Sequence, residues 1–415
     1  MERTPKSLRL HIGIFGRRNV GKSSLLNALT RQEVSIVSSQ AGTTTDPVEK
    51  PMELLPLGPV LFVDTAGIDD EGALGELRVR RTQAVLDRTD LALIVSDARG
   101  WGAFEEGMLR DLRRRGVPVI VVFNKIDLEP PCRERIEQLR ADGLPVVCTA
   151  AWSGAGLDEL RAALIQAAPA DFVNGPRIIA DLVPPGRSAV LVVPIDKEAP
   201  KGRIILPQVQ TIRDLLDGNA MCLVLKESEL ARGLEMLNEP PALVVTDSQA
   251  FAQVAAVTPA DVPMTSFSIL FARFKGDLGT LVEGALAVDQ LEPGDRVLVA
   301  ESCSHHPIEE DIGRVKIPRW LSTYVGGPLR FEHVQGHDFP ADLTGYRLVI
   351  HCGACMTNSR AVLTRILRCR QAGVPITNYG LVIAKSLGIL ERALQPSPEA
   401  LALCRARPTG LEARA

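Results

Sequence analysis

Residues 16–23 read GRRNVGKS, and this stretch predicts the strand–loop–helix start of a phosphate-binding α/β domain. An apolar run at 10–15 precedes it and a helix-like segment at 24–30 follows it. Gly16 and Gly21 let backbone N–H groups point inward around phosphate oxygens, and the helix start adds positive potential. Lys22 is expected to reach the β- and γ-phosphates, and the Ser23 hydroxyl to ligate Mg²⁺. Further nucleotide contacts in this loop are predicted for Asn19, Val20 and Ser24.

Further nucleotide motifs follow along the chain in the order that a guanine-nucleotide site requires. GTTTD at 42–46 contains Thr44, the expected Mg²⁺ and γ-phosphate contact, and DTAG at 64–67 places Asp64 near the Mg²⁺ and the Gly67 N–H near the γ-phosphate. NKID at 124–127 follows an apolar strand, and the Asp127 carboxylate can accept two hydrogen bonds from guanine that adenine cannot offer. TAA at 149–151 is expected to cover the base oxygen with a backbone N–H.

These motifs together predict a GTPase domain that binds GTP and GDP with Mg²⁺. The residues expected to act in hydrolysis are Lys22, Thr44, Asp64 and Gly67. The residues expected around the base are Asn124, Lys125, Asp127, Thr149 and Ala150.

The rate and cation dependence of hydrolysis can also be predicted. Ile68 stands where Ras-like proteins keep a glutamine that orients the attacking water, so unaided hydrolysis should be slow. Asn19 together with GTTTD resembles the potassium-activated GTPases of the tRNA-modification and ribosome-assembly group, whose loop asparagine coordinates a monovalent cation. We therefore expect K⁺ to accelerate turnover in place of an arginine finger. The alternative is that Asn19 merely caps the loop, and Arg17 and Arg18 are interpreted as solvated surface residues.

The chain of 415 residues is long enough for several domains. Apolar strands alternate with helix-like segments from 8 to 168, which is typical of a doubly wound α/β domain. A segment with two prolines at 167–176 marks a boundary, and two further α/β stretches follow. We predict three α/β domains at 1–170, 171–266 and 267–415, the first a Ras-like P-loop GTPase and the last ending in a short helix and a frayed tail.

Composition limits the classes of partner. The net charge of −3 and the aromatic content of 4% give neither a basic footprint nor stacking platforms, so nucleic acid is not an expected partner. No signal peptide and no apolar run of about 18 residues is present, so we expect a cytoplasmic protein without a membrane partner. In that reducing compartment the eight cysteines should not form disulfides, and a clustered subset is better interpreted as metal-binding.

Cysteine and histidine gather in the last part of the chain, where residues 305–351 hold five of the six histidines. ESCSHH at 301–306 and HCGAC at 351–355 each follow an apolar strand directly. If those strands are neighbours in a parallel sheet, both motifs emerge at its carboxyl edge, where such sheets place their ligands. Cys303, Cys352 and Cys355 could then bind one metal.

The residues alone leave the nature of this site open. Three cysteines and a histidine suit a closed zinc site, and three thiolates with a replaceable fourth ligand suit a 4Fe-4S cluster with one open iron. A third possibility is a set of buried cysteines beside scattered surface histidines. The other cysteines have no mates at ligand spacing and are predicted to be small buried hydrophobes; they are Cys132, Cys148, Cys222, Cys369 and Cys404.

The union of GRRNVGKS, DTAG and NKID with C-x-H at 303–305 and HCxxC at 351–355 resembles the FeFe-hydrogenase maturation GTPases. The resemblance spans the chain and implies a GTPase domain, a dimerisation domain and an iron-sulfur cluster domain. It implies that Cys303, Cys352 and Cys355 hold a 4Fe-4S cluster with an exchangeable fourth position. His305 and Glu310 are equal candidates for that position, and His351 is a candidate ligand or a supporting residue.

The same resemblance implies a function. Such a protein would accept a diiron subcluster precursor and deliver it to apo FeFe-hydrogenase, with two radical S-adenosylmethionine maturases as further partners. It would form a homodimer or a dimer of dimers, and GTP turnover would adjust the association of partners. The alternative function is a ribosome- or tRNA-associated GTPase with a structural zinc site in its tail, which the missing basic, aromatic-rich appendage disfavours.

Overall fold

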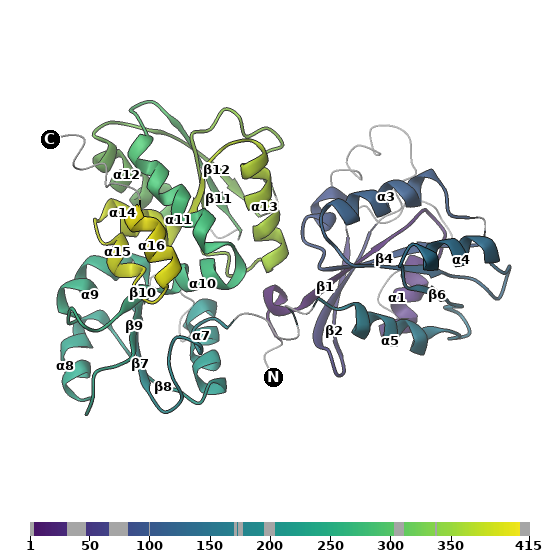
Figure 1. Cartoon of the computed structure of the whole chain (residues 1–415), viewed down its shortest axis with the longest axis horizontal. Helices are drawn as coiled ribbons and strands as arrows, with labels where there is room; N and C mark the ends of the chain where they lie inside the picture. The colour runs from purple at the N-terminus through teal and green to yellow at the C-terminus, as the bar shows by residue number, and fades with distance from the viewer. Residues whose placement is uncertain are drawn as a thin grey trace. The chain divides into compact units, whose positions relative to one another are not determined.

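The computed structural model describes residues 4–30, 47–65, 82–98, 100–169, 172, 177–194, 204–302, 311–336 and 338–406 (Figure 1). The predictions at Thr44, Gly67, Ile68, Cys303, His305 and Glu310 lie outside these residues. The chain divides into two compact units, Met1–Gly175 and Pro176–Ala415. Among the described residues, no helix has the length and apolar character needed to cross a bilayer.

The first unit is built on a six-stranded sheet in the order β2-β3-β1-β4-β5-β6. Every pairing is parallel except that of β2 with β3. The strands are β1 (Leu10–Phe15), β2 (Val48–Leu54), β3 (Gly58–Asp64), β4 (Leu91–Ser96), β5 (Val119–Phe123) and β6 (Val146–Cys148), and the short helix η1 (Lys6–Leu8) precedes them. This order is the predicted doubly wound arrangement.

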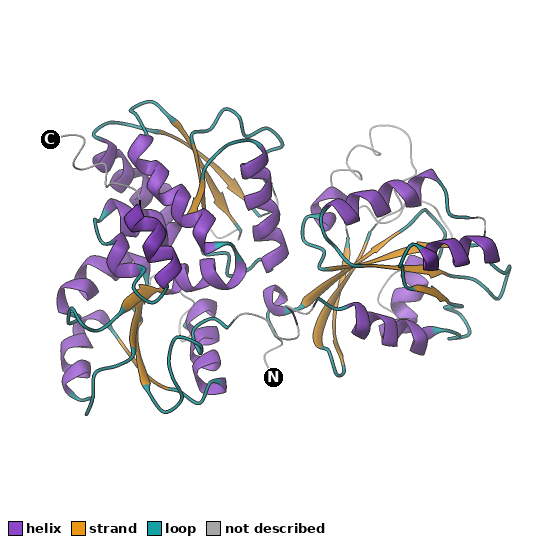
Figure 2. Cartoon of the chain, viewed as in Figure 1, coloured by secondary structure: helices purple, strands orange, loops and turns teal. Residues whose placement is uncertain are grey.

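Helices cover both faces of this sheet, as Figure 2 shows. Alternate residues of β1 point to opposite faces, so Ile12 and Ile14 pack with one helix pair while Phe15 packs with the other. The first pair is α1 (Lys22–Thr30) and α5 (Leu157–Ala167), and the second is α3 (Ala103–Arg114) and α4 (Arg133–Ala141). Because β1, β4 and β5 are buried on both sides, they are apolar without alternation, and this pattern identifies them in the sequence.

The second unit contains two four-stranded parallel sheets, ordered β10-β9-β7-β8 and β12-β11-β13-β14. The strands of the first are β7 (Ser188–Val192), β8 (Met221–Leu225), β9 (Leu243–Thr246) and β10 (Met264–Ser266). The strands of the second are β11 (Arg296–Glu301), β12 (Arg330–Gln335), β13 (Leu348–His351) and β14 (Ile376–Asn378).

The helices of this unit pack around both sheets. They are α7 (Leu206–Asp217), α8 (Leu230–Glu235), α9 (Phe251–Val257), α10 (Phe267–Lys275), α11 (Leu278–Leu286), α12 (Ile317–Val325), α13 (Ser359–Gln371), α14 (Tyr379–Ser386), α15 (Leu390–Ala393) and α16 (Pro398–Ala406). Shorter turns are η2 (Glu227–Glu229), η3 (Ser248–Ala250), η4 (Ala287–Gln290) and the π-helical η5 (Ile312–Lys316). The last helix is the one that the sequence predicts for the tail.

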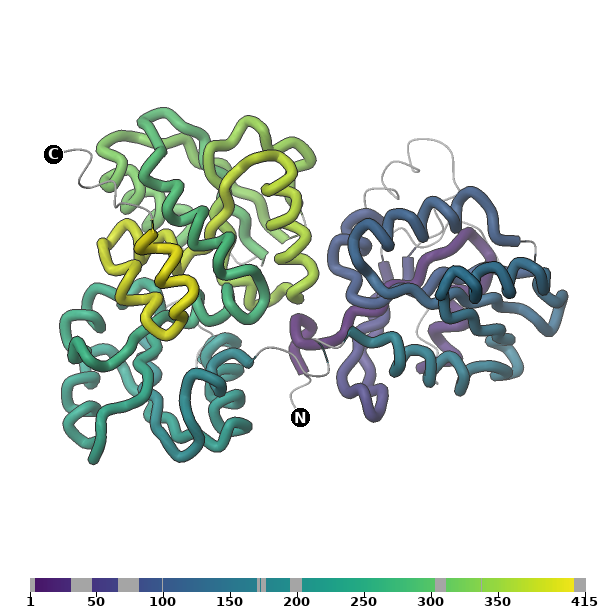
Figure 3. The backbone as a smooth tube through the Cα atoms, viewed as in Figure 1, coloured from purple at the N-terminus to yellow at the C-terminus, as the bar shows by residue number. Residues whose placement is uncertain are grey.

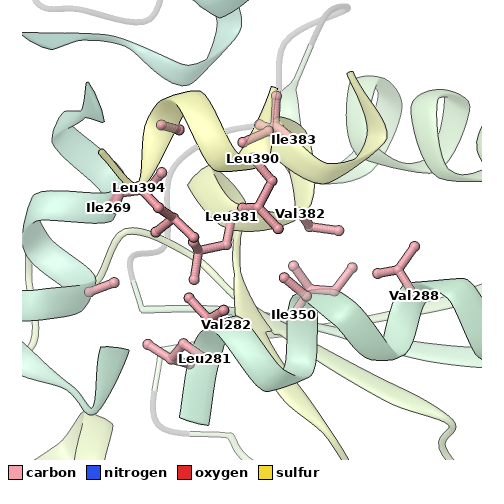
Figure 4. Packing of buried hydrophobic residues seen from close by; sticks show 14 of the residues in the cluster. Ile269, Leu281, Val282, Val288, Ile350, Leu381, Val382, Ile383, Leu390 and Leu394 are labelled. Carbon is pink, nitrogen blue, oxygen red and sulfur yellow. The ribbon is translucent and has the colours of Figure 1, made fainter. Parts of the chain in front are cut away.

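One continuous apolar core joins the two sheets of the second unit. It contains Val190 and Val244 of the first sheet together with Ile350 of the second. Figure 4 shows Leu281, Val282 and Leu381 among the buried side chains of this core. The chain also returns to the first sheet of this unit, because α15 near the C-terminus (yellow in Figure 3) contacts β10. Helix α10 contributes to this core and to the buried cluster around α7, so it lies between the sheets.

Gly284 allows α11 to approach β14 closely. A Cβ at this position would lie 1.9 Å from the carbonyl oxygen of Ile376 in β14. We expect Gly284→Ala to lower the free energy of unfolding by about 1–3 kcal/mol or more, because the helix must move off the strand. Urea unfolding followed by circular dichroism measures the change.

Gly279 on the same helix is the matched control. A Cβ there would meet its nearest neighbours at 3.4 Å, which is ordinary contact. Gly279→Ala should therefore be neutral or stabilising by up to about 1 kcal/mol, since alanine is the better helix former. Equal effects of the two substitutions would contradict the close packing of α11 on β14.

Candidate nucleotide and metal sites

The phosphate loop connects the end of β1 to α1, as its sequence predicts. Gly21 in this loop has φ of 91°, and a Cβ there would lie 2.3 Å from Asn124 Nδ2. Both the backbone conformation and the space therefore require glycine. The Asn124 amide in turn donates to the carbonyl oxygen of Val20 at 3.0 Å, so the loop is tied to the NKID segment.

Polar groups suited to a phosphate and a hard divalent cation meet beside this loop. The Lys22 ammonium donates to the carbonyl oxygens of Gly16 at 2.8 Å and Arg17 at 2.7 Å. The Ser23 hydroxyl donates to Asp64 Oδ2 at 2.6 Å, while Asp64 Oδ1 is buried without a hydrogen-bond partner among the described residues. Burial raises the pKa of Asp64, opposed by the Ser23 hydrogen bond and the Lys22 charge. A hydroxyl and a buried carboxylate are ligands that fit Mg²⁺.

The two segments predicted to surround the base are linked mainly through Asn124. Its Oδ1 accepts from the Thr149 hydroxyl at 3.1 Å and from the Ala151 N–H at 3.2 Å. Lys125 donates to the Asn19 carbonyl oxygen, and the Ala150 N–H donates to Ala155 at 3.0 Å. Asn124 and Thr149 thus hold the two loops in register.

The carboxylate expected to recognise the base belongs to the same loop. Asp127 is exposed, which leaves its side chain accessible to a ligand. Its hydrogen bonds to guanine, and the contact of Ala150 with the base oxygen, stay predictions.

Arg17 is partly exposed, with 40% of its side chain accessible, and it also pairs with a buried carboxylate, which the sequence did not indicate. Its guanidinium donates to Glu105 Oε2 at 2.9 Å, and the Gly102 N–H donates to the same oxygen at 2.9 Å. The Glu105 side chain is fully buried at the start of α3. The local sequence can predict that Glu105 caps α3, but it cannot predict a partner 88 positions away.

A cavity of about 570 Å³ opens between the phosphate loop and the NKID segment. Residues lining it include Arg17, Asn19, Ser96, Asp97, Lys125 and Leu128. Its position among the predicted nucleotide contacts makes it the candidate binding site of this unit.

The strands that precede the two cysteine motifs are neighbours in the last sheet. β11 and β13 pair in parallel, with Ala300 opposite His351, which meets the condition on which the shared metal site depends. The Ser302 N–H donates to Cys352 Sγ at 3.2 Å, so the residue directly before Cys303 contacts the HCxxC motif. Ser302 and the HCxxC motif thus lie together at the sheet edge where the sequence predicts the site.

The turn at 352–357 is organised by a lysine from another helix. Lys275, the last residue of α10, donates to the carbonyl oxygens of Ala354 at 2.8 Å, Cys355 at 3.3 Å and Thr357 at 2.8 Å. Ala354 has φ of 55°, a conformation that alanine rarely adopts.

Burial shifts the ionisation of the groups at this turn. It lowers the pKa of Lys275 to about 8, with the Cys355 and Cys352 charges opposing the shift. It also raises the pKa of the Cys355 thiol to about 11, an effect that Cys352 strengthens and Lys275 opposes. In the absence of a metal the Cys355 thiol is therefore protonated at neutral pH, and metal binding must displace that proton.

Cys352 and Cys355 are free, partly exposed thiols. Within the described ranges, no three His, Cys, Asp or Glu residues are grouped so as to hold a metal ion. The two thiols are nevertheless soft ligands at a shared turn, and the third predicted cysteine directly follows Ser302. The donor set at this edge therefore fits a thiolate-bound metal group.

His351 has both ring nitrogens engaged inside the protein. Nδ1 lies 2.8 Å from the Cys352 carbonyl oxygen, and Nε2 lies 2.7 Å from Arg365 NH1. Because arginine only donates, Nε2 accepts and Nδ1 carries the proton. Burial and then the Arg365 charge lower the pKa of His351 to about 3, so the ring is neutral. This geometry favours support of the turn over metal ligation.

The remaining cysteines divide by burial. Cys369 and Cys404 are buried, as predicted. Cys132 is exposed at the start of α4, where its Sγ contacts Glu134 at 3.0 Å, so the prediction of burial was wrong for it. Cys148 and Cys222 are partly buried. The sequence did not indicate that Lys275 and Arg365 contact this turn, because neither belongs to a metal-binding motif.

Comparison with known proteins identifies the family. Residues 178–276 match the hydrogen maturase F dimerization domain and residues 279–396 match the hydrogen maturase F tetramerization domain. The chain belongs to the hydrogen maturase F family. Residues 11–125 also match the 50S ribosome-binding GTPase model, which agrees with the P-loop GTPase domain of this family member. The predicted membership in the maturation GTPases is thereby confirmed.

Individual relatives match the GTPase part of this hydrogen maturase F family member. The GTPase Der of Wolinella succinogenes is 38% identical over 178 residues, covering 40% of this chain and 37% of that protein. The tRNA modification GTPase MnmE of Chromobacterium violaceum is 35% identical over 158 residues, covering 38% of this chain and 34% of that protein. The chain thus spans less than two fifths of these curated relatives.

Solved structures show a weaker overall likeness. A crystal structure of a variant of Aquifex aeolicus Era bound to GDP.AlF4- has a TM-score of 0.36 and 20% identity, covering 79% of this chain and 92% of that chain. The G domain of the T. maritima FeoB iron transporter has a TM-score of 0.31 and 26% identity, covering 38% of this chain and 98% of that chain.

Proposed function

We propose that this chain is a GTP-hydrolysing scaffold and carrier of hydrogenase maturation. It would bind a 4Fe-4S cluster through Cys303, Cys352 and Cys355, accept a diiron precursor as its cargo and deliver this to apo FeFe-hydrogenase. The observation that carries the proposal is the hydrogen bond from the Ser302 N–H to Cys352 Sγ, because Ser302 directly precedes Cys303 in the chain. Membership in the hydrogen maturase F family supports a role in hydrogenase maturation.

The protein's own residues have separate roles in this proposal. Ser23, Asp64 and Thr44 would surround Mg²⁺, and Lys22 would exchange its carbonyl partners for phosphate oxygens. Bound to the three cysteines, the cluster supplies an iron whose fourth position is exchangeable, with His305 or Glu310 as its proposed occupant. His351 would orient the turn through its two hydrogen bonds. GTP hydrolysis would adjust the association of partners.

The proposed assembly is a homodimer or a dimer of dimers, because the family's dimerization and tetramerization domains fill residues 178–276 and 279–396. The proposed partners are apo FeFe-hydrogenase and the two radical S-adenosylmethionine maturases. The cluster assignment is tested by iron and acid-labile sulfide content and by electron paramagnetic resonance of the reduced protein after anaerobic purification. We expect a brown protein containing iron and sulfide; a colourless protein with stoichiometric zinc would instead favour the alternative of a structural zinc site.

Potassium should accelerate GTP hydrolysis roughly tenfold or more over sodium, because a bound cation would offset phosphate charge during hydrolysis. Asn19 is exposed in the phosphate loop, where its side chain can reach such a cation. Initial rates in KCl and NaCl of equal ionic strength measure the effect. Asn19→Gly tolerates the local φ of 59° and should remove the potassium dependence. Equal wild-type rates in both salts would contradict the cation role.

A further inference from the structure

The ammonium of Lys275 is buried inside the metal-site turn. The residue is only 2% exposed, and its three hydrogen bonds among the described residues all go to carbonyl oxygens of residues 354–357. Its ammonium also lies 5.3 Å from the centroid of the Phe271 ring. Burying a cation is costly unless opposite charge lies nearby, and carbonyl oxygens provide only partial charge.

Negative charge at this turn can come from the cysteines. The Lys275 ammonium donates to the carbonyl oxygens of Ala354 and Cys355 within the turn that carries Cys352 and Cys355, and both cysteines would become thiolates on binding a metal. A fixed cation beneath thiolate ligands would stabilise the metal-bound form over the metal-free form. The same cation should make reduction of a bound cluster easier, because reduction adds negative charge.

Helix α10, which ends at Lys275, is anchored at its other end. There the Ser268 hydroxyl oxygen accepts hydrogen bonds from Asn378 Nδ2 and the Gly380 N–H, each at 3.1 Å. Those partners lie at the junction of β14 and α14, and β14 pairs with β13, the strand that precedes the HCxxC turn. The helix that carries Lys275 is therefore tied to the sheet that carries the turn.

We propose that Lys275 is a positioning residue of the metal site, which holds the turn at residues 352–357 and compensates the negative charge of its thiolate-bound metal. The identity of that metal as a cluster rests on the proposed function. The need for a cation next to two metal-binding thiolates does not rest on that function.

The test compares Lys275→Gln, which keeps hydrogen-bond donors without the charge, with Lys275→Arg, which keeps the charge. Lys385→Gln is the matched control, because Lys385 is also nearly buried in this unit but pairs with Asp289 at 2.8 Å. Metal-free chains are titrated with Co²⁺ and followed by thiolate-to-cobalt absorption, and reconstituted chains are titrated for the reduction potential. Circular dichroism verifies folding of each variant.

We expect Lys275→Gln to weaken Co²⁺ binding about tenfold or more. It should also shift the reduction potential to a lower value, and Lys275→Arg should recover part of both losses. Wild-type values in Lys275→Gln, or equal losses in Lys385→Gln, would overturn the proposal. Failure of the wild type to assemble a cluster, with the Co²⁺ dependence intact, would refute the proposed function and leave this inference standing.

A measurement on the wild type applies even if Lys275→Gln does not fold. Amine-specific acetylation followed by mass spectrometry should label Lys275 far more slowly than Lys226, whose side chain is 45% exposed, and more slowly still after Co²⁺ binding. Labelling of Lys275 at the rate of Lys226, or a rate unaffected by Co²⁺, would contradict the buried positioning role.

Discussion

Cys352→Ser should abolish the iron and sulfide content of the anaerobically purified protein while GTP hydrolysis remains. Cys352 lies at the carboxyl end of β13, and its sulfur accepts the Ser302 N–H beside the second cysteine motif. A serine oxygen is a poor ligand for the soft iron site, so one of three thiolate ligands would be lost. The phosphate loop and its partners belong to the other compact unit, so we expect their folding not to depend on this ligand.

Visible absorption, iron and sulfide analysis and a phosphate-release assay measure this separation. Cys222→Ser is the matched control, because Cys222 is partly buried on β8 and belongs to no metal motif. The control should keep both the brown colour and the hydrolysis rate. Loss of hydrolysis together with the colour in Cys352→Ser would show that the two sites are not separable as proposed.

Asp127→Asn should weaken the binding of GTP roughly 100-fold or more and shift the preference toward xanthosine triphosphate. The Asp127 carboxylate is expected to accept two hydrogen bonds from guanine, whereas an amide can donate to the extra oxygen of xanthine. Competition between the two nucleotides in a binding assay measures the change in preference. The substituted side chain is exposed, so the fold should be unaffected.

Glu129→Gln removes a neighbouring exposed carboxylate from the same loop and serves as the control. It should leave the preference for guanine unchanged. An unchanged preference in Asp127→Asn would refute the assignment of Asp127 to base recognition.

Features encoded by contiguous residues could be predicted. The phosphate loop, the apolar strands and the HCxxC motif each consist of residues that are neighbours in the chain, so their residue types reveal them. The doubly wound class of the first domain followed from these patterns, whereas the pairing of β11 with β13 was only a condition for the metal site until the structure showed it. The exposure of Cys132 could not be predicted, because a cysteine at a helix start can face solvent or core with the same local sequence.

Contacts between distant segments needed the folded chain. Lys275 precedes its carbonyl partners by 79 to 82 positions, and Arg17 lies 88 positions from Glu105. His351 was recognisable as part of a motif, yet its neutral, fully bonded state depends on Arg365 approaching from α13. Local patterns specify which elements form and which residues can bind ligands. Burial and charge at those residues come from packing between elements, and only the tertiary structure brings those partners together.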